Sequence, residues 1–199
     1  MRPYSSACER NQGPIWEVLA GYLRGDETVL EIGSGTGQHA VHFAALAPRL
    51  TWIATDVAER LPGIRTWIEA TGVTNVRGPL TLDVNEQPWP VVHADAVYSA
   101  NTAHIMSWDE VLKMIDGAAR VVGAEGLLML YGPFRRGGRH VSGSNERFDQ
   151  SLRAERASQG VRDLEAVDDA VRACGFAAAE IHEMPANNLC VAWRRRGTP

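Results

Sequence analysis

Residues 28–40 read "TVLEIGSGTGQHA", and this stretch decides the fold that the rest of the chain is expected to build. Residues 28–33 form a short apolar strand that ends in glycine. Residues 36–46 carry apolar side chains at helical spacing and are followed by Pro48, which cannot continue a helix. A strand, a glycine-rich turn and a helix in this order predict the first unit of an α/β fold, with a ligand site beyond the carboxyl end of the strand.

The same alternation continues on both sides of this stretch. A helix with Pro14 in its first turn is predicted over residues 14–24, and Pro79 marks the third strand as an edge or a bulge. The remaining elements are strands over 50–56, 76–84, 94–101 and 126–132, helices over 58–71, 107–122, 145–158 and 163–173, and a closing pair of strands over 176–184 and 189–195. Alternating strands and helices indicate a doubly wound, Rossmann-like α/β fold with a mostly parallel sheet. The closing pair has no helix between its strands, so it must be a hairpin that adds one antiparallel strand.

The composition is typical of one folded domain, spanning residues 1–199. The chain is 45% hydrophobic and 22% charged, and its formal charge of −4 argues against general binding to nucleic acids or anionic membranes. Its three cysteines are far apart and lack metal-ligand spacing, so neither a disulfide framework nor a zinc site is predicted. The first residues lack the apolar region of a signal peptide and no apolar run approaches 18 residues, so we expect a cytoplasmic protein. The sequence does not determine an oligomeric state.

Acidic side chains stand at the ends of three consecutive predicted strands. Glu31 lies two residues before the first glycine of the turn, Asp56 ends the second strand where an acid reaches ribose hydroxyls, and Asp83 ends the third, where a carboxylate can accept from an adenine amino group. Three acids around one glycine turn suit a neutral or cationic nucleoside better than a pyrophosphate. The alternative is that they are ordinary caps and turn residues. The glycine spacing is GxGxG followed by Gln38, which weakens the case for a nicotinamide dehydrogenase.

The motifs are those of a known family. "VLEIGSGTGQHA" with Asp56 and Asp83 resembles the class I S-adenosylmethionine-dependent methyltransferases. More narrowly, "SSACERNQGPI", "DAVYSANTAHIMSW", "LLMLYGPFRRGGRHVSGSNERFD", "GVRDLEAVD" and "MPANNLCVAWRR" resemble small methyltransferase-like proteins catalogued as a domain of unknown function, from about residue 3 to residue 195. The resemblance implies a seven-stranded sheet and S-adenosylmethionine as cofactor. It does not imply a methyl acceptor.

The resemblance also implies which residues contact the cofactor. Asp56 would bind the ribose, Asp83 and Val84 the adenine, and Ser99 to Asn101 would lie beside the sulfonium. From their positions, Arg10 is expected to pair with the cofactor carboxylate and His39 to touch the cofactor, although the N-terminal segment is also interpretable as a solvated cap. The full predicted set is Arg10, Glu31, Gly33, Ser34, Gly35, Gly37, Gln38, His39, Asp56, Asp83, Val84 and Ser99. No metal is expected.

The reaction centre and the acceptor site are predicted after the fourth and fifth strands. Asn101 and His104 follow the fourth strand, and His104 is either a base or a residue that fixes the turn. Residues 131–160 are expected to form a substrate lid hinged at Gly137 and Gly138, while residues 1–25 cover the cofactor rim. The predicted acceptor contacts are Tyr4, Asn11, Tyr131, Phe134, Arg135, His140, Asn145, Phe148, Asp149 and Asn187.

These patterns predict methyl transfer to a small polar metabolite, by O- or N-methylation. A nucleobase acceptor is disfavoured because the segment after the fourth strand lacks the Asn-Pro-Pro-aromatic signature. Two alternatives stay open. One is a protein methyltransferase, which needs an open groove, and the other is a cofactor-binding protein without transferase activity.

Overall fold

The computed structural model describes residues 2–197, so residues 1, 198 and 199 of the predicted domain lie outside the description. A seven-stranded sheet has the order β3-β2-β1-β4-β5-β10-β9. Its strands are β1 (Thr28–Ile32), β2 (Thr51–Asp56), β3 (Val76–Thr81), β4 (Ala94–Ala100), β5 (Val122–Gly132), β9 (Glu180–Met184) and β10 (Asn188–Arg194). Strand β10 runs antiparallel to both β5 and β9, while the other pairs are parallel. The predicted fold class is confirmed, including the single antiparallel strand.

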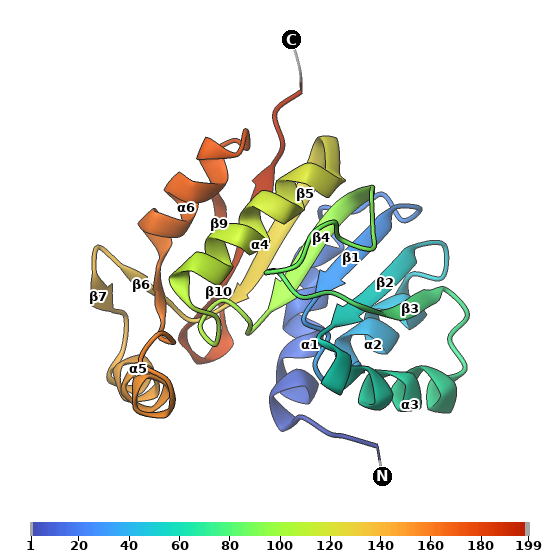
Figure 1. Cartoon of the computed structure of the whole chain (residues 1–199), viewed down its shortest axis with the longest axis horizontal. Coiled ribbons are helices and arrows are strands. Elements are labelled where there is room, and N and C mark those ends of the chain that lie inside the picture. Colours follow the sequence, from blue (N-terminus) through green and yellow to red (C-terminus); the bar gives the residue numbers. More distant parts are fainter. Residues whose placement is uncertain (1, 198–199) are drawn as a thin grey trace.

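Helices cover both faces of the sheet (Figure 1). On one face lie α1 (Ser6–Leu19), α2 (Gln38–Leu46) and α3 (Leu61–Thr71), which bury Ile15, Phe43 and Ile64 against Trp52. On the other face lie α4 (Trp108–Val121) and α6 (Leu164–Ala173), whose buried side chains belong to a second core cluster that includes Trp193. The sheet therefore separates two hydrophobic cores, and its carboxyl edge is left free for a ligand site.

Helix α1 begins at Ser6, eight positions before the predicted start at residue 14, and ends at Leu19, before the predicted end at residue 24. The Ser5 hydroxyl accepts a hydrogen bond from the Cys8 N–H at 3.3 Å and so caps the helix. The first two turns bury few apolar side chains, so hydrophobic periodicity does not detect them. Pro14 consequently lies inside the helix rather than in its first turn, and costs one intrahelical hydrogen bond.

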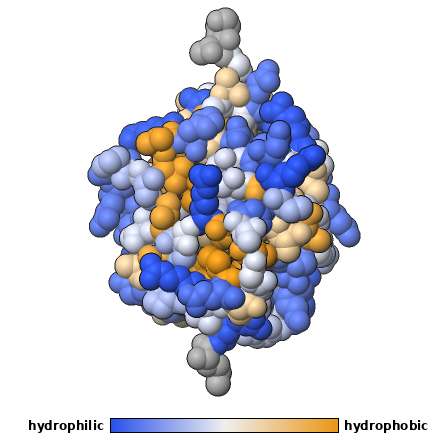
Figure 2. All heavy atoms as spheres, turned by 90° about the vertical axis from the view of Figure 1, so that its right-hand side faces the viewer, coloured by the Kyte–Doolittle hydropathy of each residue, from blue (hydrophilic) through white to orange (hydrophobic). Residues whose placement is uncertain are grey.

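The connection from β3 to β4 contains no helix over residues 82–93. In place of a helix, Leu82, Val84, Trp89 and Val91 insert their side chains into the core below α4. Strand β3 is an edge strand, as Pro79 predicted, and it ends at Thr81 rather than at residue 84. Figure 2 shows the molecule from the side of β3 and α3, where a mostly hydrophilic surface surrounds patches of hydrophobic side chains.

Residues 134–163, most of the predicted lid, form a small second sheet and a helix. Strands β6 (Phe134–Arg136), β7 (Arg139–His140) and β8 (Arg162–Asp163) form the sheet, and α5 (Gly143–Glu155) follows β7. Gly137 and Gly138 have positive φ of 55° and 74° and make the two-residue turn between β6 and β7. Their N–H groups donate to the carboxylates of Glu165 at 3.0 Å and Asp163 at 2.7 Å. These contacts hold the turn at the start of α6, and a lid over residues 131–160 stays a prediction.

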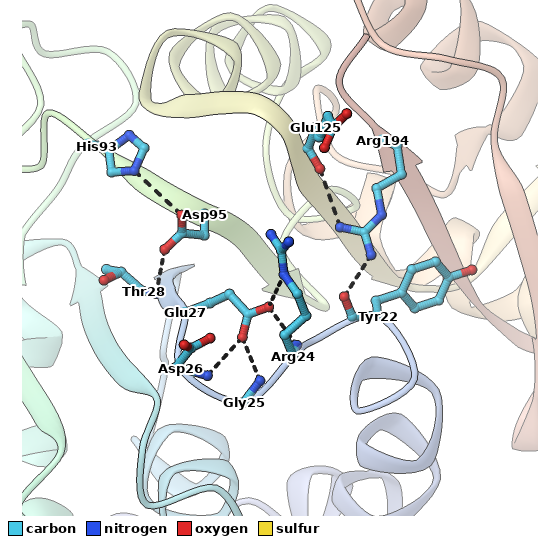
Figure 3. Close-up of polar contacts among 10 residues, drawn as sticks. All are labelled: Tyr22, Arg24, Gly25, Asp26, Glu27, Thr28, His93, Asp95, Glu125 and Arg194. Atoms are coloured by element: carbon cyan, nitrogen blue, oxygen red, sulfur yellow. Dashed lines mark hydrogen bonds and ion pairs between the residues drawn. The ribbon is translucent and has the colours of Figure 1, made fainter. Parts of the chain in front are cut away.

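The amino edge of the sheet is closed by polar contacts of the chain itself (Figure 3). The Glu27 carboxylate accepts hydrogen bonds from the backbone N–H groups of residues 24, 25 and 26. Asp95 accepts from the Thr28 N–H at 2.8 Å, and Arg194 donates to the Tyr22 carbonyl at 2.6 Å. This edge therefore satisfies its own backbone groups. Within residues 2–197, no helix has the length and apolar character needed to cross a membrane.

Candidate functional site

A cavity of about 1010 Å³ lies at the carboxyl edge of the sheet, over the ends of β1, β2, β4 and β5. Helix α1 contributes to one side of the cavity and α5 to another. The structure brings many of the predicted site residues together in its wall. They are Arg10, Asn11, Gly33, Ser34, Gly35, His39, Asp56, Asp83, Val84, Asn101, His104, Tyr131, Asn145 and Phe148.

The glycine turn between β1 and α2 forms the floor of one half of the cavity. A Cβ atom on Gly33 would lie 2.4 Å from Cγ2 of Thr102, and one on Gly37 would lie 3.0 Å from the Cα of Ile64. Both positions therefore need glycine for packing as well as for their positive φ. A Cβ on Gly35 would meet no atom within 4 Å, so the backbone there faces open space. The turn thus offers bare backbone to a ligand.

Asp56 at the end of β2 is fixed by backbone hydrogen bonds. One carboxylate oxygen accepts from the Gly35 N–H at 2.7 Å, and the other accepts from the Val57 N–H at 2.8 Å. Burial raises the pKa of Asp56, and the two backbone hydrogen bonds oppose this rise. Each oxygen keeps acceptor capacity toward the cavity, as a pair of ribose hydroxyls would need. Arg60, which was not predicted as a site residue, also lines this part of the wall.

Asp83 follows β3 and is oriented by Asn85. The backbone N–H and the side-chain amide of Asn85 both donate to one oxygen of Asp83, at 2.8 and 3.1 Å. The same amide donates to Glu110 at 3.3 Å, and the Lys113 ammonium donates to the Asn85 side-chain oxygen at 3.0 Å. Asn85 and Glu110 also line the cavity but were not predicted. The position of Asn85, two residues after the acid, is the sequence signal that was available for it.

The loop after β4 carries the two predicted catalytic residues. Asn101 has a positive φ of 58°, and its N–H donates to the Tyr131 carbonyl at 2.8 Å. His104 is buried, and its ring lies edge-on to the ring of Phe148 at a centroid distance of 5.1 Å. Burial lowers the pKa of His104 to about 4, with a further contribution from the positive charge of Arg162. The imidazole is therefore neutral at pH 7 and is a weak base.

Arg162 holds this loop against the segment that follows α5. Its guanidinium donates to the carbonyls of Ala103 at 2.9 Å, Ser158 at 2.9 Å and Met106. The carbonyl of His104 accepts from the Gly160 N–H at 2.9 Å. Arg162 was not predicted, because nothing in the sequence marks an arginine in a two-residue strand as a partner of a loop some sixty residues earlier.

A buried polar chain runs from the core to the cavity wall. Tyr98 and Asn11 contact the two ring nitrogens of His39, with the Tyr98 hydroxyl 3.4 Å from Nδ1 and the Asn11 side-chain oxygen 2.8 Å from Nε2. Burial lowers the pKa of His39 to about 4, so the ring is neutral at pH 7. The side-chain amides of Asn11 and Asn188 lie against the Tyr131 hydroxyl, where they act against the rise in its pKa caused by burial.

Residues 2–195 match the family described as "Protein of unknown function (DUF938)". The chain belongs to the DUF938 family.

Solved methyltransferase structures share the fold of the DUF938 chain. An O-methyltransferase family protein from Burkholderia thailandensis superposes with a TM-score of 0.85 and 18% identity, over 97% of this chain and 58% of that protein. The S-adenosylmethionine-dependent methyltransferase SibL gives a TM-score of 0.80 and 20% identity, over 96% of this chain and 56% of SibL. The DUF938 chain thus spans little more than half the length of these two proteins. The YcgJ protein of Bacillus subtilis is matched over its whole length, with a TM-score of 0.73, 17% identity and 96% of this chain covered. Together these matches establish the class I methyltransferase fold of the DUF938 chain.

Four residues predicted to touch the cofactor do not line the cavity of the DUF938 chain, and they support its wall from behind. The buried Glu31 accepts hydrogen bonds from the Ser34 hydroxyl at 2.7 Å and the Trp52 indole N–H at 3.0 Å, beneath the glycine turn. Burial raises the pKa of Glu31 to about 7. Gln38 accepts from the Ser5 N–H at 2.5 Å and so ties the N-terminal segment to α2, and Ser99 donates to the Ile32 carbonyl at 2.7 Å. Gly37 packs against α3.

Several predicted acceptor contacts also lie outside the cavity. Phe134 is buried in the core cluster of α4 and α6, because β6 turns its side chain inward. His140 and Asp149 lie 3.6 Å apart behind the wall, where Asp149 also accepts from the Val161 N–H at 2.6 Å. Arg135 belongs to the same small sheet and does not reach the cavity. These residues build the support of α5 rather than the acceptor surface.

Two further predicted acceptor contacts, Tyr4 and Asn187, also lie outside the cavity wall. Tyr4 is 59% exposed and bonds to Glu9 instead of facing an acceptor. Asn187 contributes only its carbonyl, which accepts from the Asn145 side-chain amide at 3.0 Å, and the neighbouring Asn188 lines the cavity in its place. Asn187 has a positive φ of 57° in the turn Pro185–Asn187, and no periodic pattern reports which of two adjacent asparagines points inward.

Proposed function

We propose that the DUF938 chain is an S-adenosylmethionine-dependent methyltransferase that acts on a small polar molecule. The observation that carries the proposal is the hydrogen bond from Gly35 to Asp56, which joins an open glycine turn to a fixed carboxylate at the next strand end. The class I methyltransferase fold supports the proposal, because the cavity lies at the carboxyl edge where such sheets bind ligands.

The residues of the cavity fit a nucleoside with an amino-acid tail. Asp56 has acceptor capacity for ribose hydroxyls, and Asp83 offers a carboxylate to an adenine amino group beside the apolar Val84. The bare backbone around Gly35 accommodates the tail, and Arg10 on α1 offers a cation to its carboxylate. S-Adenosylmethionine would supply a methyl group bound to a positively charged sulfur.

The size of the cavity fits a cofactor and a small acceptor together. Its volume of about 1010 Å³ is at the upper end of the range of about 300–1,000 Å³ for sites that hold one drug-sized ligand. Helix α5 supplies Ser144, Asn145 and Phe148 to the wall. A wall on this side of the cavity favours a small acceptor over a protein segment, which would need an open groove.

Binding and transfer are tested in two steps. Calorimetry measures binding of S-adenosylhomocysteine and NAD to the wild-type chain, and only the former is expected to bind. Methyl-labelled S-adenosylmethionine is then incubated with a metabolite extract and, separately, with a protein extract. Labelled small molecules are expected. Label in protein alone would favour the protein methyltransferase, and binding without label in either extract would favour a cofactor-binding protein without transferase activity.

A further inference from the structure

The charged side chains of the cavity are divided between its two halves. The carboxylates in the wall are Asp56, Asp83 and Glu110, and all three lie on the side of β2, β3 and the start of α4. The other half is formed by α1, the end of β4, β5, α5 and the start of β10, and within residues 2–197 it contains no carboxylate. Four carboxamides line it instead, from Asn11, Asn101, Asn145 and Asn188.

The buried polar chain fixes the direction of the hydrogen bonds that reach this second half. The Asn11 side-chain oxygen is an acceptor, so Nε2 of the neutral His39 carries the proton and donates to it. Nδ1 is then left as an acceptor for the Tyr98 hydroxyl, in agreement with the 3.4 Å distance between them. Asn11 consequently uses its oxygen on His39, which leaves its NH₂ group to donate elsewhere.

Tyr131 is buried and lines this half of the cavity together with Asn11 and Asn188. Its hydroxyl can donate a hydrogen bond to a ligand. A buried hydroxyl donor is costly without a partner, so the site favours an acceptor molecule that offers an oxygen there.

The charge of the same half also selects among possible acceptor molecules. Arg156, directly after α5, lines this half of the cavity, and within residues 2–197 no ion pair joins it to a carboxylate. A protonated amine would lose its hydration on binding here and would contact amides but no negative charge, which is unfavourable. An anionic group would meet amide N–H groups, a tyrosine hydroxyl and a guanidinium, all of which are donors.

We propose that this half of the cavity binds its acceptor through a carboxylate group and that the product is a methyl ester. The inference rests on the proposed function and names its substrate class, a small-molecule carboxylic acid. A carboxylate oxygen forms the new bond to the methyl carbon while the carbon–sulfur bond breaks and its electron pair stays on sulfur. The negative carboxylate and the positive sulfonium give two neutral groups, and no proton is transferred.

The absence of a proton transfer agrees with the residues beside the reaction centre. A hydroxyl acceptor would have to lose its proton, and the wall contains two imidazoles, those of His39 and His104. Burial holds the pKa of both near 4, with a contribution from Arg162 at His104, which makes both poor bases for a hydroxyl group. A carboxylate is already ionised at pH 7 and needs no base.

Binding of three matched probes tests the charge preference. Benzoate, benzyl alcohol and benzylamine have similar size and differ in charge, and each is titrated into the chain saturated with S-adenosylhomocysteine. Benzoate is expected to bind at least about fivefold more tightly than the other two, the effect of roughly one net hydrogen bond. Equal or tighter binding of benzyl alcohol or benzylamine, or no binding of benzoate, overturns the inference.

A pair of tyrosine variants tests the role of Tyr131. Tyr131→Phe is expected to weaken benzoate binding by about fivefold or more and to leave affinity for S-adenosylhomocysteine within about twofold. Tyr4→Phe removes the same hydroxyl from an exposed tyrosine outside the cavity and is the matched control, with no expected effect on either ligand. Equal benzoate affinity in Tyr131→Phe and wild type contradicts the assignment of this donor.

The product chemistry provides the decisive measurement. After incubation with methyl-labelled S-adenosylmethionine and a metabolite extract, mild alkali is expected to release the label as methanol, as from a methyl ester. Label that stays in alkali-stable ethers or amines overturns the inference, as does the absence of transfer by a chain that binds S-adenosylhomocysteine. Failure to bind S-adenosylhomocysteine would instead overturn the proposed function itself, so the two failures are distinguishable.

Discussion

The Asp56 carboxylate accepts a hydrogen bond from the Gly35 N–H at 2.7 Å, so the end of β2 and the turn after β1 form one fixed edge of the cavity. This contact orients the acid without using all of its acceptor capacity. The position that would bind a ribose is therefore organised before any ligand arrives, which lowers the entropic cost of binding.

Replacing Asp56 should weaken cofactor binding. Asp56→Ala is expected to reduce affinity for S-adenosylhomocysteine by about 1–3 kcal/mol, because two ribose hydroxyls and the Gly35 N–H lose their acceptor. Calorimetry at constant salt measures the change. Asp116→Asn, which disrupts an exposed ion pair with Arg120 outside the cavity, is the control. Equal affinities in Asp56→Ala and Asp116→Asn would contradict the ribose assignment.

Gly33 and Gly35 should respond differently to the same substitution. Gly33→Ala is expected to destabilise the fold by about 1–3 kcal/mol more than Gly35→Ala, because its Cβ would overlap Cγ2 of Thr102 at 2.4 Å. Both variants share the penalty of a positive φ, so the difference isolates the collision. Urea unfolding measures the free energies. Adding Thr102→Ser, which removes that methyl group and keeps the hydroxyl bonded to Ser99, should recover part of the loss; no recovery would exclude the collision as the cause.

Glu31 should make the stability of the chain depend on pH. Its pKa is raised from 4.5 to about 7 in the folded state, so between these values the folded chain holds a proton that the unfolded chain has released. The folded state therefore loses stability as pH rises through this window. This loss should be absent in Glu31→Gln. The free energy of unfolding of wild type minus that of the variant should therefore fall by on the order of 2–3 kcal/mol between pH 4.5 and pH 8. Urea unfolding across this range measures it, and a constant difference would show that Glu31 is ionised throughout.

Arg162 should control both the loop after β4 and the protonation of His104. Arg162→Gln removes a positive charge that disfavours the imidazolium and also loosens the carbonyls of Ala103 and Met106, so the pKa of His104 is expected to rise from about 4 toward its ordinary value of 6.5. NMR titration of the histidine ring protons measures the shift. Arg172→Gln, in an ion pair with Asp168 on α6, serves as control and should leave the His104 titration unchanged. An unchanged pKa in Arg162→Gln would mean that burial alone sets it.

Much of the fold was predictable from residues 28–40 and the alternation around them. Apolar periods of two and of about 3.6 residues are local properties, so the strands and most helices could be located from sequence alone. The carboxyl ends of parallel strands meet at one edge of the sheet, so residues that end or follow these strands can be predicted to lie close together. For this reason Asp56, Asp83 and Asn101 were predicted in the cavity and were found there.

The sequence could not determine which side chains of the irregular segments face the cavity. Phe134 and Phe148 lie in one polar stretch, yet Phe134 in β6 is buried in the core and Phe148 on α5 lines the cavity. Strands of two or three residues carry no measurable period, and their place depends on what they pack against.

Adjacent positions show the same limit most sharply. Asn188 rather than Asn187 lines the cavity because of a positive φ in one turn, and the orientation of the Asn11 side chain depends on its contact with His39 on another helix. The sequence by itself determined the sheet, the glycine turn and the acids at the strand ends, because these follow from local patterns and strand order. Only the tertiary structure decided the direction of the hydrogen bonds and hence the chemistry of the acceptor half, because those directions arise from contacts between residues far apart in the chain.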